Sequence, residues 1–198
     1  MLVADGFTQP GMDQRIVQAV RYGVEWIQLR DHGARPDLVE VSSSVLVRRL
    51  RHIDPHLVIS LNGHPDLATR LQVGRHEPAH QVTGEPSFAP RGRSTHDVSQ
   101  VAAAREDGLD YVLFGHVFET ASHRGEAPRG LSGLTEAVRA AEGMPVIAIG
   151  GIRPERVPFC LEAGAHGVAV LSGLMQAPNL FQAVEAYARV LTHYSNPD

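Results

Sequence analysis

Cysteine is almost absent from this sequence: Cys160 is the only one in 198 residues. A disulfide within the chain is therefore excluded, which suits a reducing compartment. The longest apolar runs are far too short to cross a membrane. The first residues also lack a charged region followed by an apolar stretch, so no signal peptide is expected. Together these features predict a cytoplasmic protein without a membrane partner.

An excess of positive charge is missing as well. The chain carries 18 basic and 22 acidic residues, for a net charge of −4. Its densest basic cluster, residues 48–52, fits the polar end of a helix. The sequence therefore lacks the electrostatic footprint of nucleic-acid binding. Self-association into a homo-oligomer is compatible with this composition.

The content that is present is typical of a globular protein, with 43% hydrophobic and 20% charged residues. The length suits one domain, which we expect to span residues 1–198. Apolar runs alternate with amphipathic stretches, and the runs are apolar nearly throughout, as in parallel strands that are covered on both faces. Five strands are predicted clearly, at residues 26–29, 57–61, 111–114, 146–149 and 167–171. Three more are weak, at residues 1–4, 79–82 and 93–95.

Helices are predicted over residues 37–51, 98–107, 134–141 and 154–163. The first would bury Leu38, Val41, Val45, Leu46 and Leu50, and the second would be capped by Asp97. Repeated strand–helix units mean either a closed barrel or an open doubly wound sheet. We expect an α/β fold, a compact (β/α)8 TIM barrel. Residues 74–92, rich in proline, glycine and histidine, are expected to form a loop over the site.

Polar or glycine residues follow the predicted strands, at the end where such barrels carry their chemistry. Gly150-Gly151 and Ser172-Gly173 follow the last two strands. Glycines there let backbone amides approach an anion, and the helices that follow add partial positive charge. The alternative is that paired glycines only make tight turns. We expect a phosphate group at this position.

His116 and Arg30 are the most informative ionisable residues at these strand ends. A neutral imidazole can take up a proton near physiological pH and release it elsewhere, so His116 is the candidate acid–base group. The other interpretation is a structural histidine. Arg30 could hold a carboxylate or a phosphate, or it could form a salt bridge with Asp31 or another acid at the rim.

The segment His76-Glu-Pro-Ala-His80 matches a zinc-protease motif by letter only. That chemistry needs both histidines on one helical face, and Pro78 would break the helix. We expect no zinc site in this segment.

Several segments in order resemble the thiamine phosphate synthase superfamily over residues 24–175. They are Gln28-Leu-Arg30, Leu61-Asn-Gly-His-Pro-Asp-Leu-Ala68, Ser94-Thr-His96, Asp110 to Thr120, Val146 to Ile152 and Gly167 to Gly173. The resemblance implies a (β/α)8 barrel, an enzyme of thiamine biosynthesis and a phosphorylated thiazole as ligand. The substrate-binding residues that it and the strand ends suggest are Gln28, Arg30, Asn62, Ser94, Thr120, Gly150, Gly151, Ser172 and Gly173.

The synthase branch of this superfamily joins a pyrimidine pyrophosphate to thiazole phosphate and needs magnesium. Gly63 stands where that branch has an aspartate, and His32 and His123 stand where it has lysines. Residues 79–86 do not reproduce its second acidic ligand; only Glu85 is near. Loss of hard oxygen ligands argues against magnesium. We therefore expect no metal or other cofactor.

The tautomerase branch, often called TenI-like, has Phe-Gly-His-Val-Phe-Glu-Thr, which this chain carries intact at residues 114–120. The resemblance implies that His116 moves a proton on a carboxythiazole phosphate, which becomes aromatic. His96 or Glu119 could share this work. Thiazole tautomerase is the expected function. The alternatives are a thiamine phosphate synthase with altered ligands and a non-catalytic, regulatory protein that binds thiazole phosphate.

Overall fold

The fold is a closed ring of parallel strands, seen in a computed structural model that describes residues 1–79 and 88–195. One sheet joins eight strands in sequential order. They are β1 (Leu2–Asp5), β2 (Trp26–Arg30), β3 (Val58–Asn62), β4 (Gly74–Glu77), β5 (Arg91–Thr95), β6 (Tyr111–Gly115), β7 (Val146–Ile149) and β8 (Gly167–Ala169). A parallel bridge between Leu2 and Val170 closes the sheet. The predicted (β/α)8 barrel is confirmed, and the open-sheet alternative is wrong.

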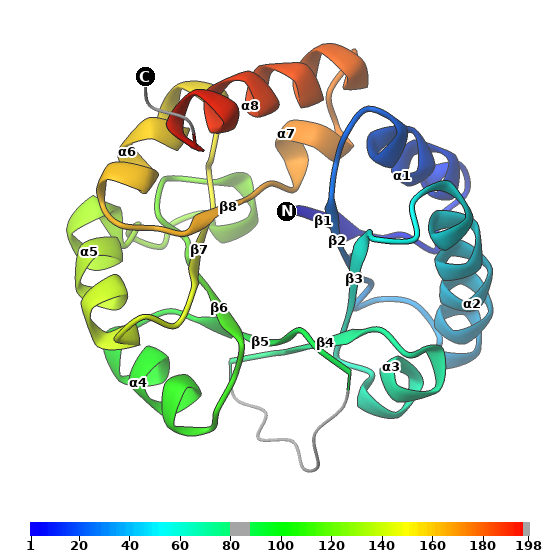
Figure 1. Cartoon of the computed structure of the whole chain (residues 1–198), viewed down its shortest axis with the longest axis horizontal. Helices are drawn as coiled ribbons and strands as arrows, with labels where there is room; N and C mark the ends of the chain where they lie inside the picture. Colours follow the sequence, from blue (N-terminus) through cyan, green and yellow to red (C-terminus); the bar gives the residue numbers. More distant parts are fainter. Residues whose placement is uncertain (80–87, 196–198) are drawn as a thin grey trace.

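Helices surround the strands on the outside of the barrel (Figure 1). They are α1 (Met12–Arg21), α2 (Pro36–Ile53), α3 (Pro65–Leu71), α4 (Val98–Glu106), α5 (Gly130–Ala141), α6 (Val157–Glu162), α7 (Ser172–Met175) and α8 (Leu180–Ser195). Short 3₁₀ turns occur at η1 (Ala121–His123) and η2 (Pro154–Arg156). Within residues 1–79 and 88–195, no helix combines the length and apolar character that a bilayer crossing needs.

Local signals in the sequence explain where two of these helices begin. The Asp97 carboxylate accepts a hydrogen bond from the Gln100 backbone N–H at 2.9 Å, as expected for a helix cap. Pro36 opens α2, where its missing N–H has no cost. The predicted buried face of α2 was wrong in part. Val39, Ser43, Leu46, Val47 and Leu50 are buried, whereas Leu38, Val41 and Val45 are 46%, 63% and 51% exposed. The hydrophobic stripe is wider than the face that meets the barrel.

The fourth strand lies earlier than the sequence suggested. β4 is Gly74–Glu77, not residues 79–82, of which Ala79 lies outside any strand and 80–82 are not described. Arg75 and Glu77 on this strand are buried, together with Arg93 of β5. Glu77 accepts hydrogen bonds from Arg75 at 2.7 Å and from Arg93 at 2.8 Å. The prediction missed β4 because it relied on apolar runs, whereas the buried residues of β4 are charged.

The expected loop over residues 74–92 is therefore also corrected. Its two ends are the barrel strands β4 and β5, and residues 80–87 in its middle are not described. His76 belongs to β4 and not to a helix, so the zinc-protease geometry is not formed at this residue; His80 lies outside the described part.

Two apolar clusters pack against the strands, one between the strands and the helices and one inside the barrel. The larger cluster fills the layer between strands and helices. The smaller one joins Val3, Tyr111, Leu113, Ile147 and Ala169, with the Trp26 ring 4.7 Å from that of Tyr111. In contrast, one polar residue from each of β2, β3 and β4 lies at the Tyr111 hydroxyl: Gln28, Ser60 and His76. The barrel interior is thus apolar on one side and polar on the other.

Candidate functional site

A cavity of about 120 Å³ opens at the carboxyl ends of the strands. Nine of the ten predicted substrate-binding and catalytic positions line it, and Asn62 is the exception. The nine are Gln28, Arg30, Ser94, His116, Thr120, Gly150, Gly151, Ser172 and Gly173. Its remaining walls come from Thr95, His96, Leu113, Gly115, Ser122, His123, Ile149, Ile152, Ala169, Val170 and Leu171. Because parallel strands end at one rim, residues from five strands meet around this space.

Asn62 ends β3 and does not line this cavity. Its side chain is buried, and its Oδ1 has no hydrogen-bond partner within the described part of the chain. The Gly63 backbone N–H next to it donates to His76 O at 3.1 Å. The sequence correctly placed Asn62 at a strand end, and the register puts it next to Arg30 on the neighbouring strand, but it does not line the cavity.

His116 lies directly after β6 and is only 3% exposed. Its Nε2 lies 3.3 Å from the backbone carbonyl oxygen of Glu126. A carbonyl can only accept a hydrogen bond, so this contact assigns the proton of a neutral ring to Nε2. The lone pair is then on Nδ1. His116 is thus oriented by its own loop and keeps one nitrogen with which it could accept a proton.

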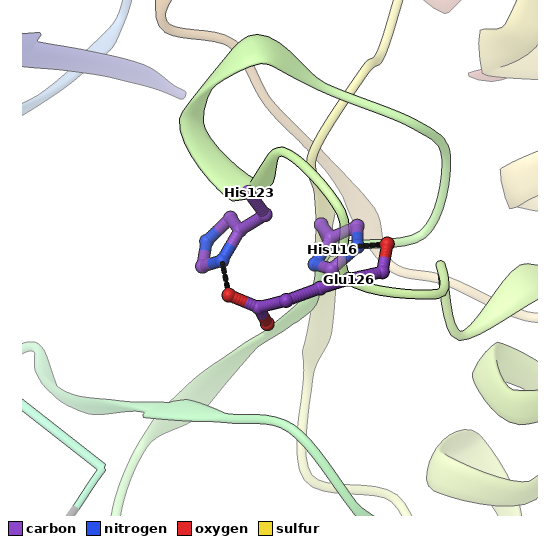
Figure 2. A group of neighbouring side chains, drawn as sticks. All are labelled: His116, His123 and Glu126. Atoms are coloured by element: carbon purple, nitrogen blue, oxygen red, sulfur yellow. Dashed lines mark hydrogen bonds and ion pairs between the residues drawn. The ribbon is translucent and has the colours of Figure 1, made fainter.

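Two further histidines lie beside His116. The His123 ring stacks on it at 4.6 Å with an angle of 11° between the planes, and Figure 2 shows both with Glu126. His123 Nδ1 lies 3.3 Å from Glu126 Oε1. His96 approaches His123 edge-on at 6.3 Å, and its Nδ1 bonds Gly115 O at 2.8 Å. The rim at this point is therefore rich in imidazole nitrogen.

Arg30 is held by an acid of the neighbouring strand. Its Nε and Nη2 donate to the two carboxylate oxygens of Asp5, at 3.0 Å and 2.9 Å. The salt-bridge alternative is therefore realised, with Asp5 and not with Asp31, which instead accepts from the Thr8 hydroxyl at 2.6 Å. Arg30 remains part of the cavity wall and presents a fixed guanidinium there.

The glycine pair after β7 allows the loop that begins at His116 to pack closely against the end of β7. Gly150 and Gly151 have φ angles of +98° and +65°. Phe118 N–H donates to Gly150 O at 3.0 Å, and Val117 N–H donates to Ile149 O at 2.9 Å. A Cβ on Gly151 would lie against Glu119 O and 2.9 Å from Phe118 Cβ. The close approach of the backbone of residues 117–119 therefore requires glycine at these two positions, whether or not an anion binds there.

We expect Gly151→Ala to destabilise the protein by about 1–3 kcal/mol more than Gly108→Ala, because overpacking adds to the cost of a positive φ angle. Gly108 is a matched control, since its φ is +68° and no atom lies within 4 Å of an added Cβ. Urea unfolding of both variants measures the difference. Equal losses would contradict the close approach of the 116–119 loop.

A hydrogen-bonded chain runs from the cavity into the barrel. Ser94, which lines the cavity, lies 2.9 Å from His76 Nε2, and His76 Nδ1 lies 2.9 Å from the Tyr111 hydroxyl. Burial, and to a smaller extent the positive Arg30, lower the pKa of His76 to about 3. His76 is therefore neutral at physiological pH. It positions the Ser94 hydroxyl and is not a candidate acid–base group.

Three residues at this site were not predicted from the sequence as members of it: Asp5, His123 and Glu126. Asp5 ends β1, which is a weak strand by sequence, although its register with Arg30 on β2 follows once both strands are known. His123 and Glu126 lie in the long connection from β6 to α5. Only their spacing of three residues hinted that the two side chains could meet.

Comparison with known proteins places this barrel in a family. The family model described as thiamine monophosphate synthase matches residues 3–174. A thiamine-phosphate synthase of Thermus thermophilus is 36% identical over 179 residues, which cover 87% of this chain and 85% of that protein. A solved structure, thiamine phosphate pyrophosphorylase from Pyrococcus furiosus, superposes with a TM-score of 0.85 at 23% identity and covers 98% and 96% of the two chains.

Another relative, the thiamine-phosphate synthase of Synechococcus sp. strain WH7803, is 35% identical over 202 aligned positions. These cover 93% of this chain but 56% of that protein, so the chain spans about half of this longer relative. The match to the family model extends the expected region of resemblance, 24–175, to the first strand. The chain belongs to the thiamine monophosphate synthase family.

Proposed function

We propose that the chain is a thiazole tautomerase, which isomerises a carboxythiazole phosphate to its aromatic form. The family to which it belongs supports a role in thiamine biosynthesis at the coarser level. The observation that carries the finer proposal is the position of His116, a buried histidine in the cavity wall whose Nε2 faces Glu126 O, which leaves the lone pair on Nδ1. In this reaction the ring carbon that bears the carboxylate loses a proton and the exocyclic carbon gains one.

One base can serve both steps if it lies over the ring. Nδ1 takes the proton from the ring carbon, which gives an imidazolium that Glu126 O stabilises through Nε2–H. The imidazolium then returns a proton to the exocyclic carbon. Aromatisation supplies the driving force, so the reaction needs no oxidant and no second substrate.

The remaining cavity wall suits the other parts of this ligand. Leu113 and Ile149 offer apolar contacts for a heterocyclic ring. Gln28 is 1% exposed and lines the cavity, so its side-chain amide could donate to a ligand oxygen. Ser172 and Gly173 begin α7 opposite the Gly150-Gly151 turn, where we place the phosphate.

A second candidate is thiamine phosphate synthase, because the relatives from Thermus thermophilus and Synechococcus carry that name. Its pyrophosphate substrate needs strong neutralisation of charge. The chain contains no lysine, since all 18 basic residues are arginine. His32 and Gly63 stand at positions where the synthase branch has lysine and aspartate. These replacements favour the tautomerase over the synthase.

Two assays on the same preparation separate the candidates. With a chelator present, we expect isomerisation of carboxythiazole phosphate and no formation of thiamine phosphate from the pyrimidine pyrophosphate and thiazole phosphate. Coupling that disappears in chelator and returns with magnesium would overturn the proposal in favour of the synthase. Tight binding of thiazole phosphate with neither activity would favour a regulatory binding protein.

A further inference from the structure

A cluster of three metal-ligating side chains lies at the mouth of the cavity. Among the described residues, His116, His123 and Glu126 form the one group of three or more potential ligands whose donor atoms lie within 4.8 Å of one another. Figure 2 shows the two imidazole rings and the Glu126 carboxylate on the same side of the loop.

One ligand pair of the cluster already has the separation expected in a tetrahedral site. Two ligands of a zinc ion, each about 2.0–2.2 Å from the metal, lie roughly 3.3–3.5 Å apart. His123 Nδ1 and Glu126 Oε1 are 3.3 Å apart. His123 and Glu126 are 37% and 60% exposed, so their side chains have room to turn toward His116.

The tautomer of His116 is a second, independent feature. A histidine that binds a metal usually donates its other ring N–H to a carbonyl or a carboxylate. Nε2 of His116 faces Glu126 O in this way, which leaves Nδ1 for an ion.

The loop that carries the cluster is held at both ends. Arg129 N–H donates to His116 O at 2.9 Å, and Gly130 N–H donates to Val117 O at 3.0 Å. Within it, His123 N–H donates to Thr120 O at 3.2 Å. An ion would therefore order little additional backbone on binding.

The ligand types select the class of ion. Two imidazoles and one carboxylate suit Zn²⁺ and its neighbours in the first transition row, whereas Mg²⁺ prefers six oxygens. We propose that His116, His123 and Glu126 bind one transition-metal ion of the Zn²⁺ class, and that this ion inhibits the enzyme by occupying the nitrogen with which His116 accepts a proton. The inhibition rests on the proposed function, but the metal binding does not.

The binding is tested on the untagged full chain by titration of Zn²⁺ against a chromophoric chelator, without substrate. We expect one ion per chain and no competition by Mg²⁺. His123→Ala and Glu126→Gln should each weaken the affinity by about 100-fold or more, since even outer partners of a metal ligand contribute 10–100-fold. His52→Asn is the control, because this histidine is exposed on α2 and lies near the end of that helix.

The inhibition is tested by following isomerisation at increasing Zn²⁺. We expect loss of turnover that a chelator reverses, at a Zn²⁺ concentration that rises in Glu126→Gln in parallel with its weaker binding. Unchanged affinity in both variants would overturn the site. Tight binding in this cluster without inhibition would overturn the regulatory role. If no isomerisation is seen in metal-free protein, the proposed function fails, whereas the binding result stands by itself.

Discussion

Replacing His116 with asparagine is expected to lower turnover of the carboxythiazole phosphate by about 10²- to 10⁴-fold, the range that positioned acid–base catalysis contributes. Asparagine preserves a donor toward Glu126 O, the oxygen that Nε2 of His116 faces at 3.3 Å, but it cannot accept and return a proton. Affinity for the phosphorylated ligand should change little, because the proposed phosphate site belongs to β7, β8 and the residues after them. Initial rates and a ligand titration measure the two quantities separately.

His96→Asn is the informative comparison for this variant. His96 also lines the cavity, but its Nδ1 bonds Gly115 O and its ring faces His123 and not His116 directly. We expect a smaller loss than for His116→Asn. A larger loss in His96→Asn would transfer the role of base to His96.

Glu77→Ala is expected to cost about 3–5 kcal/mol of unfolding free energy, the usual effect of removing one partner from a buried ion pair. Glu77 is 2% exposed and lies between the guanidinium groups of Arg75 and Arg93, which are themselves buried. Without the carboxylate, two positive charges remain close together inside the protein. Urea unfolding at neutral pH measures the loss.

Glu40→Ala provides the control for Glu77→Ala. Glu40 pairs with Arg70 at 2.9 Å, but both side chains are 55% exposed. Water screens such a pair, so the loss should be only about 0–1 kcal/mol. Similar losses in both variants would mean that water reaches the charges of β4 and β5, and that these ion pairs do not hold the two strands together.

The strands that could be predicted are those that are apolar on both faces. β7 was predicted with its observed bounds, residues 146–149, because it packs against apolar residues inside and outside the barrel. β4 was misplaced because its buried residues are ionic, and the partner on β5, Arg93, is distant in sequence. No periodicity of apolar residues marks such a strand, and only the three-dimensional pairing explains its burial.

The site could be predicted to the extent that it follows from strand ends. Gln28, Arg30 and His116 were placed at one rim because parallel strands of a barrel all end there. That rule cannot say which neighbours face each other across the rim. It therefore grouped Asn62 with residues that line the cavity, which Asn62 does not, and it suggested Asp31 where Arg30 pairs with Asp5.

Loop geometry accounts for the other omissions. His123 and Glu126 meet His116 only because the connection from β6 to α5 folds back, with its ends held by Arg129 and Gly130. Such a path depends on contacts with the Gly150-Gly151 turn of the next strand. The sequence therefore contains the residues of this cluster, but their proximity depends on how the loop folds.

The central claim is that His116 carries the proton between two carbons of the substrate. Its most direct test is isomerisation in deuterated water, with deuterium at the exocyclic carbon followed by NMR for the parent protein and for His116→Asn at saturating substrate. We predict that the parent protein adds deuterium at this carbon as it isomerises the substrate. His116→Asn should do so about 10²- to 10⁴-fold more slowly. Equal rates of deuterium incorporation in the two proteins would contradict the account and leave His116 as a residue that only shapes the cavity.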